Sequence, residues 1–344
     1  MIIDVHNHFY PPAFLDALRS GDSELQVRDD AEGNPVLYSP GDANVAVPGH
    51  RIIAYREQAI AQAHVDRQLI SLTCPGTLLE TPQRSAEFAQ LVNDEFASIV
   101  ATRSDHFTAL ATLPLNDPQA SVTEFDRIMT MGFPGCMLMG NVNGVPLADK
   151  RFWPLYEHAN MTSAIMYIHP TFPLGVEVMR EYWLMPLVGF LFDTTLAAAH
   201  LVFAGVPQRF PRIKWVLGHL GGTIPYLAER LDRGYEAFPE CRVNIPKPPS
   251  EYLKQFYYDT VNFDPKALRL AIEFAGVDQI LAGSDYPHQI GSIDRMKATI
   301  DQLDMRDGDR AKILGGNAAR LLGLNLPLVR DAHRIRRTSA SDSA

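Results

Sequence analysis

Eight short apolar segments alternate with stretches of helical spacing along most of this chain. Alternating strands and helices build a parallel sheet covered by helices. No glycine-rich turn of the dinucleotide-binding type follows the first segment, so eight repeats favour a closed (β/α)₈ TIM barrel over an open doubly wound sheet. The predicted strands are residues 1–9, 68–73, 107–115, 135–140, 164–170, 213–220, 256–261 and 279–287.

The intervening segments carry helix start signals. In three of them a residue suited to capping precedes a proline, and proline fits the first helical position because its missing N–H would have no partner there. We therefore predict helices starting at these dipeptides: Thr81-Pro82, Asp117-Pro118 and Asp264-Pro265.

Two regions depart from the alternation. Residues 21–50 are rich in turn residues, with β-prone patches near 25–27 and 36–38. We predict that they form a small insertion after strand one, a lid over the C-terminal face of the barrel. Residues 326–344 hold a basic cluster and a Ser-rich end, and we predict a mobile tail without an assigned role. Residues 1–325 would then form one barrel domain.

Composition narrows the classes of partner. The net charge of −9 argues against nucleic acid, whose phosphates are bound by clustered Lys and Arg. Three widely spaced cysteines form neither a disulfide framework nor a zinc ribbon, which fits a reducing compartment. Residues 185–206 are strongly apolar but include Asp193 and His200, so we interpret them as a buried helix instead of a membrane span. We expect a cytoplasmic protein without nucleic-acid or membrane partners.

The first strand is polar at alternate positions. Asp4, His6 and His8 share one face, because successive side chains on a strand point to opposite sides. In a barrel this face points into the lumen, and imidazoles at positions i and i+2 can reach one metal ion. A pair of hydrogen-bonded core histidines explains the same pattern equally well.

Three other predicted strands also end on polar residues. His169 closes strand five, His219 strand six and Asp285 strand eight, which places all three at the C-terminal mouth, where such barrels hold their active sites. Each alone is explained by turn chemistry, but their convergence with the first-strand histidines favours a metal. Imidazole and carboxylate ligands suit Zn²⁺, with Mn²⁺, Fe²⁺ or Co²⁺ as alternatives, and an open site of this kind is catalytic.

This set of residues resembles the amidohydrolase superfamily. The strings "DVHNHFYP", "GFPGCMLM", "YIHP", "RFPRIKWVLGHLGG" and "GSDYPH" are similar to its aminocarboxymuconate-semialdehyde decarboxylase-like branch, also called amidohydrolase family 2. The similarity extends from residue 1 to about 324.

The resemblance implies a set of roles for these side chains. His6, His8, His169 and Asp285 would bind one divalent metal, Zn²⁺ being the first expectation. His219 would be the catalytic acid/base, with Asp285 assisting. No lysine ends strand four, so the carbamylated-lysine bridge of binuclear relatives is not expected. Relatives are commonly dimers or tetramers, and we expect a homodimer or homotetramer.

The activity implied is a metal-dependent, non-oxidative decarboxylation of a small unsaturated or aromatic carboxylic acid, in aromatic-compound catabolism or secondary metabolism. A hydrolase acting through metal-activated water on an amide, a lactone or a C–C bond of a ring-cleavage product is the alternative, with a hydratase as a variant. A non-catalytic barrel with a structural metal is disfavoured, because His219 is superfluous to a closed site of four ligands.

One departure from the family concerns the substrate. The aminocarboxymuconate enzyme holds its substrate carboxylates with two arginines, one of them supplied across a dimer interface, and here Asn44 and Phe238 stand near those positions. Arg51 is then a candidate anion clamp, whereas Arg230 and Arg233 fit exposed salt bridges better. Candidates to wall an aromatic ring are Phe172, Tyr182, Trp183 and His288.

Overall fold

The computed structural model describes residues 1–19, 23, 25–39 and 42–324, so the predicted tail at 326–344 lies outside the described residues. Eight parallel strands form the centre, one overlapping each predicted segment. They are shorter than predicted, because the chain turns into loops soon after each strand. The barrel strands are β1 (Ile3–His8), β5 (Arg67–Ser71), β6 (Phe107–Ala109), β7 (Gly135–Met139), β10 (Ile165–His169), β11 (Lys214–Leu217), β12 (Tyr257–Asp259) and β13 (Ile280–Leu281).

The strands pair in two parallel sheets, β1-β5-β6 and β13-β12-β11-β10-β7. Isolated parallel bridges join the sheets at both edges, Asn7 with Tyr286 and Ala111 with Cys136. At the first of these seams a Cβ on Gly283 would lie 2.8 Å from the His6 Cβ, so only glycine allows the two backbones to approach. The predicted (β/α)₈ barrel is confirmed.

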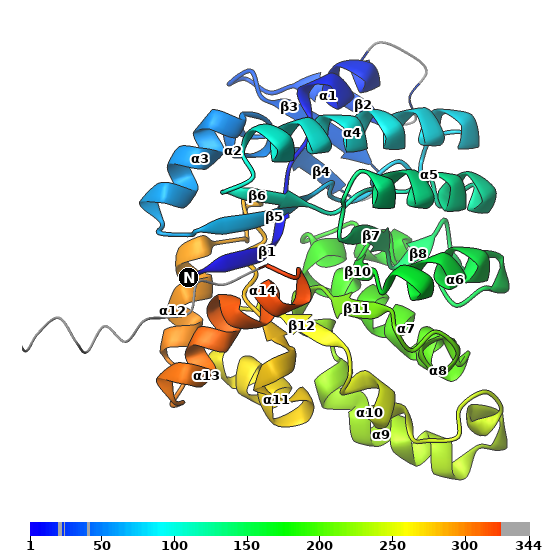
Figure 1. The fold of residues 1–344 in the computed structure, drawn as a ribbon. Coiled ribbons are helices and arrows are strands. Elements are labelled where there is room, and N and C mark those ends of the chain that lie inside the picture. Colours follow the sequence, from blue (N-terminus) through cyan, green and yellow to red (C-terminus); the bar gives the residue numbers. More distant parts are fainter. Residues whose placement is uncertain (20–22, 24, 40–41, 325–344) are drawn as a thin grey trace, which may run out of the picture.

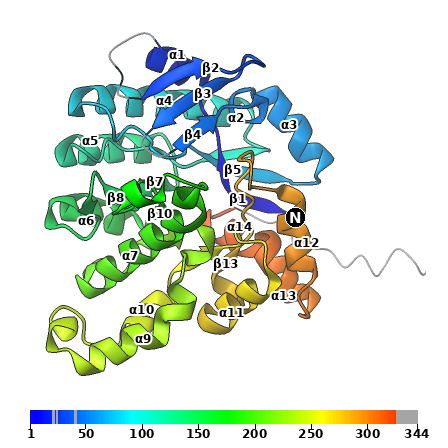
Figure 2. The same cartoon turned by 180° about the vertical axis from the view of Figure 1, so that it is seen from behind.

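Helices surround the strands on all sides (Figures 1 and 2). The three predicted capping residues accept backbone N–H bonds at the starts of α4, α5 and α11, which confirms these helix starts. The helices are α1 (Pro12–Arg19), α2 (Pro48–Arg51), α3 (Ile53–Gln62), α4 (Pro82–Thr102), α5 (Pro118–Thr130), α6 (Trp153–Thr162), α7 (Phe190–Phe203), α8 (Val206–Arg209), α9 (Ile224–Ala237), α10 (Pro249–Leu253), α11 (Pro265–Ala275), α12 (Ile293–Asp301), α13 (Asp307–Ala311) and α14 (Asn317–Leu321).

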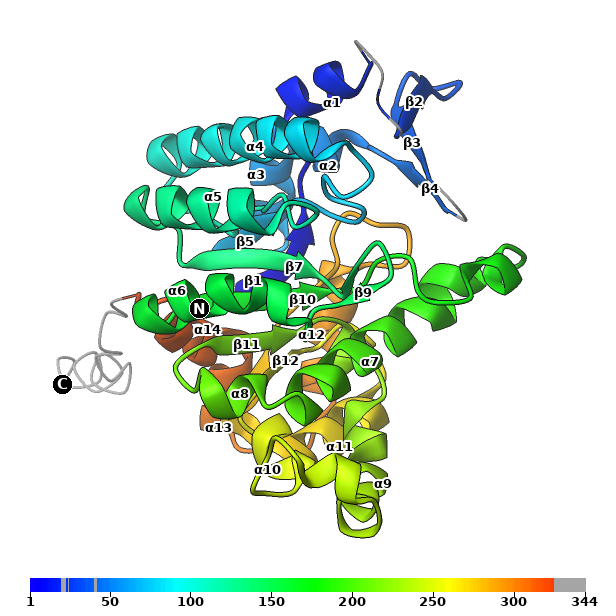
Figure 3. The same ribbon diagram turned by 90° about the vertical axis from the view of Figure 1, so that its right-hand side faces the viewer.

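The insertion after β1 forms an antiparallel sheet of β2 (Gln26–Asp29), β3 (Pro35–Ser39) and β4 (Asp42–Val45). The first two strands match the predicted β-prone patches, whereas β4 was not predicted. Figure 3 shows this sheet on the side toward which β7 and β11 point, so it lies near the C-terminal mouth of the barrel. A two-stranded hairpin, β8 (Asn141–Val142) with β9 (Val145–Pro146), follows β7.

The apolar stretch at 185–206 is helical but only partly buried, which corrects the prediction of a buried helix. A single-turn helix η3 (Met185–Gly189) continues into α7. Among the described residues this is the one helix that is long and apolar enough to span a membrane, and 44% of it is buried inside the protein. Its outer face leaves Leu187, Phe192 and Leu196 between 42% and 53% exposed. Sequence hydropathy cannot show which apolar faces the chain itself covers.

The guanidinium group of Arg56 is fully buried and links three segments near the barrel mouth. Arg56 Nε donates to the Gly49 carbonyl (3.0 Å), and its Nη1 donates to Asn7 Oδ1 (2.7 Å) and Gln68 Oε1 (3.0 Å). Its Nη2 donates to the His8 carbonyl. Burial lowers the pKa of Arg56 to about 10. The side chain thus fixes β1, β5 and the start of α2 together.

Replacing Arg56 by methionine is expected to lower the free energy of unfolding by about 3 kcal/mol, because four buried oxygen acceptors lose their donor. Urea unfolding followed by circular dichroism measures this change. The control is Arg233→Met on the exposed face of α9, for which a change within about 0.5 kcal/mol is expected. Equal urea midpoints for the two variants would contradict the assigned role of Arg56.

Candidate metal centre

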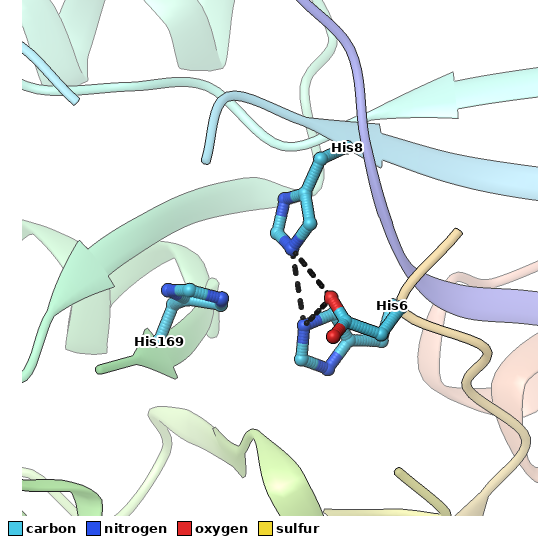
Figure 4. A group of neighbouring side chains, drawn as sticks. His6, His8 and His169 are labelled. Carbon is cyan, nitrogen blue, oxygen red and sulfur yellow. Dashed lines mark hydrogen bonds and ion pairs between the residues drawn. The ribbon is translucent and has the colours of Figure 1, made fainter. Parts of the chain in front are cut away.

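Four side chains from three parts of the barrel converge at its C-terminal mouth. His6 and His8 come from β1, His169 ends β10, and Asp285 lies in the loop after β13. One ligand atom from each lies within 4.8 Å of all the others. His6 Nε2 and His8 Nε2 are 3.2 Å apart, and Asp285 Oδ1 is 3.5 and 3.3 Å from them. Figure 4 shows the three histidine rings around this common point.

The contacts of the three histidine Nδ1 atoms determine which ring nitrogen faces the cluster. Each histidine has its Nδ1 next to an oxygen of the surrounding protein, so its Nε2 stays available toward the centre. This is the arrangement that orients imidazole ligands in metalloproteins. The Nδ1 contacts are His6 with Asp259 Oδ2 (2.5 Å), His8 with Ser71 Oγ (3.3 Å) and His169 with the Pro170 carbonyl (2.7 Å).

The donor set fits a divalent cation. Burial lowers the pKa of His8 to about 3 and that of His169 well below its ordinary value, so both rings are neutral. Burial opposes ionisation of Asp285, but the surrounding imidazoles, His288 foremost, hold its pKa well below the usual range. Asp285 Oδ1 is buried and has no hydrogen-bond partner among the described residues. Burial would lower the pKa of His6 as well, but the charge of Asp259 and its hydrogen bond outweigh burial and raise it. Two neutral imidazoles and an unsatisfied carboxylate oxygen are in the states that bind Zn²⁺ or Mn²⁺, and a metal would displace any second proton from His6.

His219 lies beside this cluster without belonging to it. Its Nε2 is 3.8 Å from Asp285 Oδ2, and its ring centre is 4.8 Å from that of His6. Its Nδ1 is buried and makes no hydrogen bond within the described part of the chain. Both His219 (φ 51°) and Asp285 (φ 56°) adopt the left-handed conformation, which is strained for residues other than glycine and typical of functional sites.

Asp259, at the end of β12, was missed in the sequence analysis. Its carboxylate accepts bonds from His6 Nδ1 (2.5 Å), the Tyr167 hydroxyl (2.6 Å) and the backbone N–H groups of His219 (3.1 Å) and Leu220 (3.0 Å). Burial would raise the pKa of Asp259, but the charge interaction and hydrogen bond with His6 lower it. One carboxylate thus positions a candidate metal ligand and the candidate acid/base. The rule that identified His169 and Asp285, a polar residue closing an apolar strand, also applies to Asp259.

Replacing Asp259 by asparagine is expected to weaken metal binding by about 10- to 100-fold, because the neutral amide is a weaker acceptor for His6 Nδ1 than the carboxylate, and its NH2 group would face backbone N–H donors such as that of Leu220. Titration of the metal-free protein with Mn²⁺ or Zn²⁺ measures the dissociation constant. The matched control is Glu124→Gln, a buried carboxylate on α5 that binds Asn93 and Arg127. If both variants bind metal as the wild type does, Asp259 has no role in orienting His6.

A cavity of about 460 Å³ opens onto the cluster. The insertion forms one wall, η3 and α7 form another, and the loop after β13 forms a third. His169, His219 and Asp285 lie at its base. The other lining residues are Asp30, Ala31, Glu32, Asn34, Ala43, Asn44, Val45, Val47, His50, Thr73, Cys74, Trp183, Pro186, Leu187, Phe190, Pro287, His288, Gln289 and Ile290.

Only some of the predicted substrate-binding residues line this cavity. Trp183 and His288 line the cavity. Arg51 does not, because its Nε donates to the Ala46 carbonyl (3.0 Å) and its Nη2 to Asn34 Oδ1 (3.2 Å). The guanidinium is thereby engaged in holding the insertion, which argues against its predicted role as an anion clamp.

The remaining predicted residues also lie elsewhere. Phe172 lines a separate, smaller cavity of about 180 Å³. Tyr182 is 79% exposed and outside the main cavity, since the loop before η3 turns its ring to solvent. Arg230 and Arg233 are exposed on α9, and Arg233 pairs with Glu236 (3.6 Å), as the salt-bridge interpretation predicts.

Known proteins are similar to this chain in sequence and in fold. The 2-amino-3-carboxymuconate-6-semialdehyde decarboxylase of Dictyostelium discoideum is 33% identical over 83% of this chain and 79% of its own length. The crystal structure of 5-carboxyvanillate decarboxylase from Sphingomonas paucimobilis has a TM-score of 0.82 and 26% identity, covering 94% of this chain and 99% of that one.

A third similar protein is a dihydroxybenzoic acid decarboxylase from Polaromonas sp. JS666, with a TM-score of 0.78 and 24% identity over 95% of this chain and 98% of that one. Its crystal structure contains manganese and the inhibitor 2-nitroresorcinol. The sequence model of the amidohydrolase family matches residues 3–324. The chain therefore belongs to the amidohydrolase family, in the branch that includes the aminocarboxymuconate-semialdehyde decarboxylases.

Proposed function

We propose that this protein is a metal-dependent, non-oxidative decarboxylase of a small aromatic or unsaturated carboxylic acid, in aromatic-compound catabolism or secondary metabolism. The observation that carries the proposal is the position of His219, which lies outside the four-residue cluster but lines the same cavity. A cluster with a proton-carrying group next to it suits catalysis better than structural metal binding. Similarity to decarboxylases of three different carboxylic acids supports the reaction type.

We propose one divalent metal, held by His6, His8, His169 and Asp285. When bound, it would act as a Lewis acid that holds the substrate's carboxylate or adjacent hydroxyl and stabilises developing negative charge. The imidazole-rich ligand set supports Zn²⁺, and the manganese in the Polaromonas enzyme makes Mn²⁺ the alternative. Elemental analysis of the purified protein distinguishes the two metals.

His219 would transfer a proton to the substrate carbon that bears the carboxylate. The C–H bond forms with the ring's electrons, and the C–C bond to the carboxylate then breaks and returns its electron pair to the ring as CO₂ leaves. Asp285 Oδ2 lies 3.8 Å from His219 Nε2, close enough for its charge to stabilise positive charge on the imidazole. Phe190, whose ring centre is 6.2 Å from that of His219, limits access of water to the proton.

We also propose that residues 1–325 act as one catalytic unit with the insertion at 21–50 as its lid. Nine residues of this insertion line the cavity that opens onto the cluster, which supports this role: Asp30, Ala31, Glu32, Asn34, Ala43, Asn44, Val45, Val47 and His50. The cytoplasm is the proposed compartment, because three widely spaced cysteines provide no disulfide framework, which fits a reducing environment.

A homodimer or homotetramer is the proposed assembly, with a second copy of the chain covering the exposed apolar face of η3 and α7. Leu187, Phe192 and Leu196 lie on this face. Replacing Phe192 by aspartate is expected to produce monomers, because a charge would be buried in the interface. Light scattering after size-exclusion chromatography measures the mass. A wild-type monomer, or a Phe192→Asp protein of wild-type mass, would contradict the proposed interface.

A hydrolase is the second candidate, because a metal held by the same four residues could also activate water for hydrolysis. The two reactions differ in whether water enters the product. The metal-loaded protein is incubated in heavy-oxygen water with a panel of hydroxybenzoates and of the corresponding hydroxybenzamides, and the products are analysed by mass spectrometry. A decarboxylase releases CO₂ and leaves no heavy oxygen in the aromatic product. Heavy oxygen in that product, without release of CO₂, would establish the hydrolase.

A further inference from the structure

The cavity has a polar residue that neither the metal cluster nor His219 accounts for. His50, on α2, is 1% exposed and lines the cavity. Neither of its ring nitrogens has a hydrogen-bond partner in the part of the chain that the structure describes. Buried polar groups are almost always satisfied, so two unpaired nitrogens in one buried ring call for a ligand.

Neighbouring rings hold His50 in place. Its ring centre is 4.8 Å from that of His288 and 5.5 Å from that of Tyr10. The His288 ring is tilted against that of His8, with 5.0 Å between the ring centres, and its Nε2 lies 3.2 Å from the Thr73 hydroxyl. His50 is therefore separated from the metal cluster by one intervening ring. A molecule that reaches the metal with one end can reach His50 with another part of its ring.

The electrostatics of the cavity restrict what this molecule can carry. Among the described residues no lysine or arginine lines the cavity, whereas Asp30 and Glu32 do. The two nearest guanidiniums, Arg51 and Arg56, are engaged elsewhere by hydrogen bonds. Burial lowers the pKa of His50 well below its ordinary value, so the ring offers one donor and one acceptor without charge. A second carboxylate on the ligand would be buried without a counter-charge.

We propose that His50 determines specificity by hydrogen-bonding a neutral polar substituent, such as a ring hydroxyl, on a substrate with a single carboxylate. The inference rests on the proposed function, because it assigns the carboxylate to the metal. A preference for a substrate with one carboxylate would distinguish this cavity from sites that bind dicarboxylates. Asn44 and Thr73 on the same cavity are neutral too, in keeping with a substrate whose only charge is at the metal.

Binding measurements test the proposal. The Mn²⁺-loaded protein is titrated calorimetrically with benzoate, with 2-, 3- and 4-hydroxybenzoate and with benzene-1,3-dicarboxylate. At least one hydroxybenzoate is expected to bind about tenfold more tightly than benzoate, the effect of one hydrogen bond in a buried site. The dicarboxylate is expected to bind no more tightly than benzoate.

Two variants test whether His50 causes the preference for hydroxybenzoate over benzoate. His50→Phe keeps the ring contacts and removes both nitrogens, so the preference for the hydroxybenzoate should disappear while benzoate binds as before. His50→Gln retains a neutral donor and acceptor and should recover part of the preference. The control is Ile290→Ala in the apolar wall of the cavity, which should weaken all ligands equally.

Three outcomes would overturn the inference. They are an intact hydroxyl preference in His50→Phe, a dicarboxylate that binds more tightly than benzoate, and no binding of any of these compounds to the metal-loaded wild type. The readout does not depend on cleavage of the C–C bond. CO₂ release without the hydroxyl preference therefore overturns the role of His50 and leaves the decarboxylase standing. Preference without CO₂ release contradicts the decarboxylase alone.

Discussion

Replacing His219 by alanine is expected to lower kcat by about 10³- to 10⁴-fold while the protein keeps its full metal content. His219 lies outside the group of four possible ligands, so its loss leaves every ligand atom in place. The proton required at the carbon that loses CO₂ then has no donor at the base of the cavity. Steady-state kinetics of CO₂ release and elemental analysis of the same preparation measure the two quantities together.

The control for this variant is His158→Ala. His158 pairs with Asp126 (2.7 Å) on the outside of the barrel and has no part in the cavity. Its kcat and metal content are expected to match the wild type. Loss of metal from the His219→Ala protein would make His219 a ligand. Wild-type kcat in that protein would exclude it as the proton donor.

Replacing His8 by alanine is expected to weaken metal binding by at least about 100-fold, and CO₂ release should fall below detection with it. His8 supplies one of three imidazoles, and its Nε2 lies 3.2 Å from that of His6 and 3.3 Å from Asp285 Oδ1. With three candidate ligands left, the site should bind the metal more weakly and no longer provide the arrangement of four ligands.

Thermal unfolding gives an independent readout of this loss. A ligand that binds only the folded state stabilises it, so added Zn²⁺ or Mn²⁺ should raise the Tm of the metal-free wild type. The same additions should leave the Tm of His8→Ala unchanged. Ser71→Ala, which removes the contact with His8 Nδ1 and a hydrogen bond to the Asn7 carbonyl but no candidate ligand, should retain part of the shift. A full shift in His8→Ala would exclude His8 from the site.

The barrel and the convergence at its mouth could be predicted because both follow from local patterns. Alternation along β1 places His6 and His8 on one side, and parallel strands deliver the polar residues at their ends to the same rim. The same rule points to His169, His219 and Asp285. It also holds for Asp259, which ends β12 and was not among the predicted site residues, so this residue could have been found from its position in the sequence.

Other features depend on contacts between distant segments and could not be predicted. The direction of Arg51 is set by the Ala46 carbonyl and by Asn34 of the insertion, and no local pattern reports such a contact. His50 reaches the cavity because α2 returns to the mouth of the barrel, and its unpaired nitrogens are visible only in three dimensions. The solvent exposure of one side of α7 could not be predicted for the same reason, since hydropathy does not distinguish an apolar face that is covered from one that is exposed.

The central claim is that the site removes a carboxylate by protonating the carbon that bears it. The most direct measurement uses carboxyl-¹³C-labelled hydroxybenzoates with the metal-loaded protein in D₂O, followed by mass spectrometry of gas and product. We predict equal amounts of ¹³CO₂ and of arene carrying one deuterium at the vacated carbon, both absent with His219→Ala. Failure of every labelled acid to release ¹³CO₂ with either Zn²⁺ or Mn²⁺ bound would contradict the claim.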